Sequence, residues 1–154
     1  MRRAVVLGAI AAVVVTFAAW PSAAAEKPKT FKLTATLTPG AEVPAVDQPG
    51  ARGAFSGTYN SGTGVLTWKI TFSGLSGAAT AAHIHAGKRG VSGPVRVPLC
   101  GPCTSGQHGS MIIGGAGGAG SLAKGLKPSY VNVHTEANPA GEIRGQMKVT
   151  AATK

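Results

Sequence analysis

Glycine and proline recur along the sequence so closely that long helices cannot dominate the fold. The 154 residues include 23 Gly and 10 Pro; Gly raises the entropic cost of a helix, and Pro removes an amide donor. No heptad pattern survives this spacing, which excludes a coiled coil. A hydrophobic content of 44% with 13% charged residues disfavours wholesale disorder. The composition therefore predicts a small globule built from short β-strands.

The first 25 residues have the layout of a secretory signal peptide. Arg2 and Arg3 give a basic start, residues 4–20 carry no charge, and a small-residue A-x-A site ends at Ala25. We predict cleavage after Ala25, which leaves one domain over residues 26–154. The expected destination is the periplasm or the medium, with no stable membrane insertion once the leader is removed.

The charge balance favours some partners over others. Loss of Arg2 and Arg3 lowers the formal charge from +10 to +8. The basic residues are scattered and lack interleaved aromatics, so no nucleic-acid partner is expected. Weak attraction to anionic cell-surface polymers or lipids is the ordinary consequence of this charge. The sequence assigns neither a specific extracytoplasmic ligand nor an oligomeric state.

Two segments alternate apolar and polar side chains in the manner of half-buried strands. Residues 31–38 read F-K-L-T-A-T-L-T, and residues 65–72 repeat the pattern. The turn-rich residues 60–64 join the second segment to a strand predicted over residues 52–59, forming a β-hairpin. Further strands are expected at 80–86, 95–99, 110–113, 130–135 and 142–149. These elements predict an all-β fold, an antiparallel β-sandwich or Greek-key barrel of seven or eight strands.

Residues 114–126 are glycine-rich and predict a loop. They contain the pattern G-x-G-x-x-G. A dinucleotide site requires a strand that leads directly into this pattern and a helix that starts from it. The sequence does not offer this combination, so this function is excluded.

Cys100 and Cys103 form a C-G-P-C sequence. In an oxidising compartment the favoured interpretation is a local disulfide that shapes a turn. A thiol-disulfide redox site is the alternative, but the residues that follow have loop composition rather than the helical start that activates such a cysteine.

Three histidines are candidate metal ligands. His83 and His85 are two residues apart on a predicted strand and share one face, and His134 is expected on the outward face of another strand. Three imidazoles facing solvent from one sheet would suit copper or zinc. Alternatively, they hydrogen-bond to turns and hold loops in place. Tyr130 and Asn132 share the face of His134 and could orient an imidazole or simply cover the sheet.

Arg144 has two interpretations. Alternation in residues 142–149 places it on one strand face with Glu142, Gln146 and Lys148. There it could guide an anion to the histidines. The interpretation we favour is a structural arginine paired with Glu42 or Glu136.

Five motifs occur in an order that resembles a CHRD (chordin-type) domain. They are G-A-E-V-P-A-V at 40–46, A-A-H-I-H-A-G at 81–87, G-P-V at 93–95, Y-V-N-V-H-T at 130–135 and G-E-I-R-G-Q-M at 141–147. The resemblance covers residues 31–149. It implies an extracellular module, found as repeats in chordin and as single exported domains in bacteria. It also implies an immunoglobulin-like or superoxide-dismutase-like β-sandwich without assigned enzymatic activity.

A more distant similarity is to copper/zinc superoxide dismutases. His83, His85 and His134 match the order of that family's copper ligands, His108 could stand as a fourth, loop-borne ligand, and Arg144 occupies the position of an anion-steering arginine. The chain has four histidines, too few for a complete copper/zinc site. The leading hypothesis is a non-enzymatic exported module with a binding or envelope-structural role, to which copper or zinc binding through His83, His85 and His134 could belong. The alternative is a copper-dependent superoxide-dismutase-like redox enzyme.

Overall fold

The computed structural model describes residues 29–113 and 128–152. The predicted leader and the glycine-rich segment 114–126 lie outside these residues. No helix within the described ranges has the length and hydropathy needed to cross a membrane. The described strands are β1 Thr30–Leu37, β2 Arg52–Asn60, β3 Val65–Ser73, β4 Ala79–Ala86, β5 Val95–Cys100, β6 His108–Ile112, β7 Ser129–Thr135, β8 Ile143–Gln146 and β9 Lys148–Ala151, with a short 3-10 turn at Pro39–Ala41.

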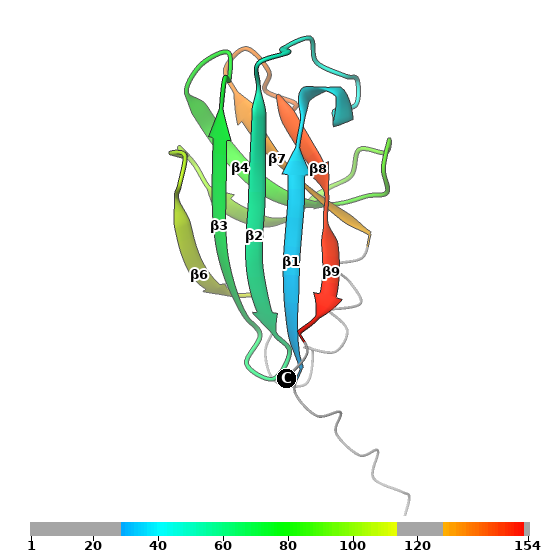
Figure 1. Cartoon of the computed structure of the whole chain (residues 1–154), viewed down its shortest axis with the longest axis vertical. Coiled ribbons are helices and arrows are strands. Elements are labelled where there is room, and N and C mark those ends of the chain that lie inside the picture. Colours follow the sequence, from blue (N-terminus) through cyan, green and yellow to red (C-terminus); the bar gives the residue numbers. More distant parts are fainter. Residues whose placement is uncertain (1–28, 114–127, 153–154) are drawn as a thin grey trace, which may run out of the picture.

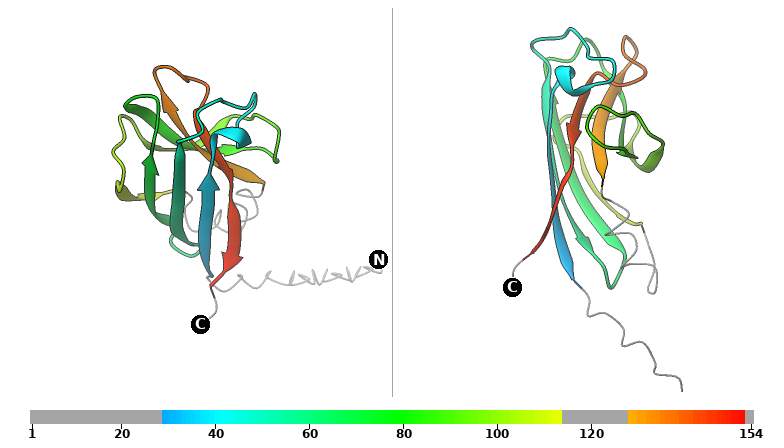
Figure 2. Two further views of the ribbon diagram at one scale, coloured as in Figure 1. Left: turned by 45° about the horizontal axis from the view of Figure 1, so that its top comes forward. Right: turned by 90° about the vertical axis from the view of Figure 1, so that its right-hand side faces the viewer.

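The strands form two antiparallel sheets packed face to face, which confirms the predicted all-β sandwich. One sheet has the strand order β6-β3-β2-β1-β9, and the other has the order β5-β4-β7-β8. Figure 1 shows the five-stranded sheet in front, and the right-hand view of Figure 2 shows the two layers from the side. The predicted hairpin is formed by β2 and β3, in which Tyr59 pairs with Leu66.

Alternation along the strands places the apolar side chains between the two sheets. Leu33, Leu66 and Ile70 of the five-stranded sheet are fully buried, as are Ile84 and Val131 of the four-stranded sheet. Each strand directs every second residue inward, because successive side chains of a strand point to opposite faces. The core therefore occupies one layer, and each sheet keeps a second, outer face.

The prediction of one continuous strand over residues 142–149 is wrong. The chain forms β8 in the four-stranded sheet, breaks at Met147 and continues as β9 in the five-stranded sheet. The Met147 amide donates to the Ser129 carbonyl at 2.9 Å. Alternation continues across the break, so the sequence does not reveal it. Consequently Arg144 and Lys148 lie in different sheets and do not share a face.

Two loops cover the outer face of the four-stranded sheet. They are residues 87–94, between β4 and β5, and residues 136–142, between β7 and β8. We call this outer face the covered face; its side chains include those of His83, His85, Tyr130, Asn132, His134, Arg144 and Gln146. The site described below lies on it.

Candidate metal site

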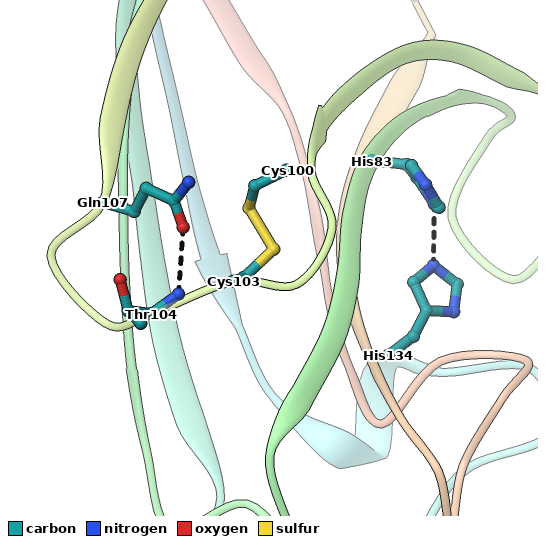
Figure 3. The surroundings of a disulfide bond; sticks show 6 residues. All are labelled: His83, Cys100, Cys103, Thr104, Gln107 and His134. Carbon is teal, nitrogen blue, oxygen red and sulfur yellow. Dashed lines mark hydrogen bonds between the residues drawn. A yellow bond between two sulfur atoms is a disulfide. The ribbon is translucent and has the colours of Figure 1, made fainter.

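The fold brings the three predicted histidines together. His83 and His85 come from β4, and His134 comes from the adjacent strand β7. One ring nitrogen from each histidine lies within 4.8 Å of the other two. The closest pair is His83 Nδ1 and His134 Nε2, 3.0 Å apart (Figure 3). A tetrahedral ion with metal–nitrogen distances of 2.0 to 2.1 Å needs donor atoms about 3.3 Å apart. Small shifts of the imidazole rings would therefore bring all three nitrogens to ligating distance of one ion.

The expectation that all three imidazoles look outward into solvent is only partly met. They do lie on the side of the sheet away from Ile84 and the core, but His85 and His134 are each only 8% exposed. His83 is half-buried. Sequence alternation identifies the face of a sheet, but it carries no information about the loops that cover that face.

Backbone carbonyls from the two covering loops fix two of the imidazoles. His85 Nδ1 lies 2.9 Å from the Gly93 carbonyl, and His134 Nδ1 lies 3.0 Å from the Pro139 carbonyl. Because a carbonyl oxygen only accepts, both Nδ1 atoms must carry a proton, which leaves both Nε2 atoms with a free lone pair in the neutral ring. Carbonyl groups that hold ligand histidines in this way are typical of metal sites.

The Nε2 atoms of His134 and His85 differ in whether they have a hydrogen-bond partner. His134 Nε2 accepts a hydrogen bond from His83 Nδ1, since the proton of His134 is on its other nitrogen. His85 Nε2 is buried and has no hydrogen-bond partner. A buried lone pair without a donor is unfavourable, and a bound cation would satisfy it.

Burial, with the neighbouring imidazoles, favours the uncharged form of His83 and of His134. Burial lowers the pKa of His83, and the adjacent His134 and His85 lower it further. Burial also lowers the pKa of His134, and the hydrogen bond to Pro139 opposes this only in part. Neutral imidazole is the form that binds metals, so the site favours ligation at neutral pH.

Glu142 anchors the loop that supplies the Pro139 carbonyl. Its buried carboxylate accepts hydrogen bonds from the Ser76 amide at 2.6 Å and from Thr135 Oγ1 at 2.5 Å. Burial alone would raise the pKa of Glu142, but these hydrogen bonds hold it below its ordinary range. The carboxylate therefore stays ionised and ties the loop to the sheet.

Arg144 anchors the other loop. Its Nη2 donates to the carbonyls of Lys88 and Val91 at 3.1 and 2.7 Å, and its Cζ lies 3.4 Å from the centre of the Tyr130 ring. The Tyr130 ring in turn stacks on His85, with ring centres 4.9 Å apart. A cation held against an aromatic face in this way is stabilised by the ring quadrupole.

Arg144 therefore has a structural role, as we favoured, but with partners other than those predicted, and it is not placed to guide an anion. Its side chain is only 2% exposed, so it is poorly placed to meet an incoming anion. It also makes no direct ion pair with Glu42 or Glu136 in the described part of the chain. Its positive charge does lower the pKa of Glu42, although burial outweighs this and raises that pKa to about 7.

His108 does not join the cluster. It lies in β6 of the five-stranded sheet, pairs with Lys69 and is exposed. The described histidine group consists of His83, His85 and His134. The groups that sequence analysis missed are the carbonyls of Gly93 and Pro139. Because every residue carries a carbonyl, no side-chain signal could have identified them.

The predicted disulfide is present. Cys100 and Cys103 are bonded, with their Cα atoms 5.4 Å apart (Figure 3). Cys103 is 7% exposed and belongs to the core, and its amide donates to the Ala79 carbonyl at 3.0 Å. The disulfide therefore fixes the segment after β5 against β4, the strand that carries two of the histidines.

These observations define a class of protein: an antiparallel β-sandwich with a largely buried three-histidine cluster on the outer face of one sheet. The family model of the CHRD domain matches residues 33–147. The chain therefore belongs to the CHRD domain family. No curated protein and no solved structure matches it.

Proposed function

We propose that this chain is an exported, non-enzymatic CHRD module that binds one copper or zinc ion through His83, His85 and His134. The observation that carries the proposal is the buried Nε2 of His85, which has no partner and belongs to a cluster whose donor atoms lie within 4.8 Å of one another. All three donors are nitrogens, the ligand type that suits both metals. Export rests on the leader-like residues 1–25.

Binding would change the protonation of His83 but not the charge of the cluster. In the unbound state its Nδ1 proton faces His134 Nε2. For Nδ1 to ligate, the proton moves to Nε2 of the same ring, and the ring stays neutral. His85 and His134 already hold their protons on the nitrogens that face carbonyls, so neither needs to change.

We favour a binding module over the dismutase-like alternative. That alternative drew on His108 as a fourth ligand and on Arg144 as an anion guide. The first lies in the other sheet, and the second is buried against Tyr130. The metal-binding proposal needs neither residue.

The test is equilibrium dialysis of the protein, without an affinity tag, against Cu²⁺ and Zn²⁺ separately. We expect one ion per chain. His85→Ala should weaken binding at least about a hundredfold, since it removes a ligand rather than a supporting group. His108→Ala is the matched control and should bind like the unmodified protein. Equal binding by His85→Ala and His108→Ala would reject the site.

A further inference from the structure

The outer face of the five-stranded sheet differs from the covered face in being uncovered and basic. We call it the open face; it consists of the outward side chains of β6, β3, β2, β1 and β9, the sheet in front in Figure 1. Strand register arranges these side chains in rows that cross the sheet. One row is His108, Lys69, Ser56, Thr34 and Lys148, and the next is Ser110, Thr67, Thr58, Lys32 and Thr150.

The two rows contain only basic and hydroxyl side chains, and nine of the ten residues are exposed. No acidic side chain lies on the described part of this face. The described carboxylates are elsewhere: Glu42 and Glu142 are buried, and Asp47 and Glu136 lie in loops. Acidic and basic side chains are thus separated within the described part of the molecule. The open face is positive because its own charged side chains are all basic, and not only because the whole chain has a net positive charge.

The spacing on this face suits an extended partner. Neighbouring strands are about 4.8 Å apart and alternate residues of a strand about 6.8 Å apart. Lys32, Lys69 and Lys148 therefore form a triangle with sides of about 8 to 15 Å. Hydroxyl groups fill the interval, including the hydrogen-bonded pair Thr58 and Thr67, whose Oγ1 atoms lie 2.6 Å apart. Lys32, Lys69 and this threonine pair also line a shallow hollow.

We propose that the open face binds an acidic polysaccharide. The lysines would meet the carboxylate groups of the polymer, and the hydroxyl rows would hydrogen-bond to its sugar hydroxyls. The inference does not depend on the metal site, which lies on the outer face of the opposite sheet.

Two other polyanions fit this face less well. Single-stranded nucleic acid is held by aromatic stacking in addition to charge, and the described part of the open face carries no Phe, Tyr or Trp side chain. An element that lies in a lipid surface combines its basic residues with an apolar stripe. Here the large apolar side chains are Val65 and Ile112, which pair at one end of the β3–β6 edge.

The experiment measures binding of the protein to immobilised polygalacturonate at low and physiological salt. Lys32→Gln combined with Lys69→Gln should weaken binding about tenfold, and salt should weaken binding of the unmodified protein, because the contacts are ionic. Lys88→Gln combined with Arg96→Gln is the matched control. It removes the same charge from exposed positions outside the open face and should change binding less than about twofold.

Two further arms test the kind of partner. Thr58→Val combined with Thr67→Val keeps β-branched residues but removes the hydroxyls, and should weaken polygalacturonate binding about threefold. Long-chain polyphosphate and anionic phospholipid vesicles should bind more weakly than polygalacturonate. The proposal would be overturned if the control variant (Lys88→Gln with Arg96→Gln) lost as much polygalacturonate binding as the variant of the open face (Lys32→Gln with Lys69→Gln). It would also be overturned if polyphosphate or vesicles bound as tightly as polygalacturonate.

Discussion

The two sheets of this sandwich share one core, but their outer faces differ in burial and in charge. The covered face holds Arg144 and Asn132 at 2% and 1% exposure, beneath loops whose carbonyls meet its side chains. The open face carries lysines and threonines in direct contact with solvent. The difference shows that a buried polar site in a small β-protein requires loops to cover it. In a sheet with the same alternating pattern but without such loops, the outward polar side chains stay exposed to solvent.

The strongest test of this comparison is at the point where the chain passes from one sheet to the other. A Cβ added to Gly145 of β8 would lie 2.1 Å from the Thr36 carbonyl oxygen of β1. Backbone atoms cannot move aside as a side chain can, so the two sheets would have to separate locally. We expect Gly145→Ala to lower the free energy of unfolding by about 4 kcal/mol, within the range of severe overpacking.

Urea denaturation followed by circular dichroism measures this effect. Gly77→Ala is the matched control, because nothing lies within 4 Å of a Cβ at that exposed position. It should leave the unfolding midpoint almost unchanged. If both variants had the same unfolding midpoint, the close approach of β8 to β1 would not be what holds the two sheets together at this point.

The next prediction compares one cation from each face. Arg144→Met removes the donor to the carbonyls of Lys88 and Val91 and the cation above Tyr130. We expect a loss of about 3 kcal/mol, since hydrogen bonds to buried charged groups are the strong ones. Lys148→Met, four residues later on the open face, should change stability by less than about 0.5 kcal/mol. Thermal unfolding of the two variants in one buffer gives the comparison. Similar losses would mean that the covering loop is not held by Arg144.

The sequence predicted the open face better than the covered face, because loops cover only the second of them. Residues 31–38 and 65–72 alternate cleanly, because one side of the five-stranded sheet meets water and the other side meets the core. The same alternation placed His83 and His85 correctly opposite Ile84. It could not reveal that loops bury His85, that a backbone carbonyl fixes its tautomer, or that the chain changes sheets at Met147. Those features depend on tertiary contacts that leave no periodic signal in the sequence.

The last prediction concerns pH and the buried carboxyl at the margin of the covered face. Burial raises the pKa of Glu42 from 4.5 to about 7 against the opposing charge of Arg144, and its Oε1 is buried without a partner. Between these two values the folded protein retains a proton that the unfolded chain has lost. Stability from this group is therefore fully present below about pH 4.5 and declines as the pH rises through about 7.

A shift of this size corresponds to at most about 3 kcal/mol, and we expect about 2 because water can relax the loop around Glu42. Glu42→Gln cannot ionise, so the difference in unfolding free energy between it and the unmodified protein should change by this amount between pH 4.5 and pH 8. The histidines titrate in both proteins, so their contribution cancels in the difference. Asp47→Asn, at an exposed loop position, is the matched control and should reproduce the profile of the unmodified protein. A difference that did not vary with pH would show that folding leaves the pKa of Glu42 at its ordinary value, and that the covered face tolerates a buried negative charge beside Arg144 at neutral pH.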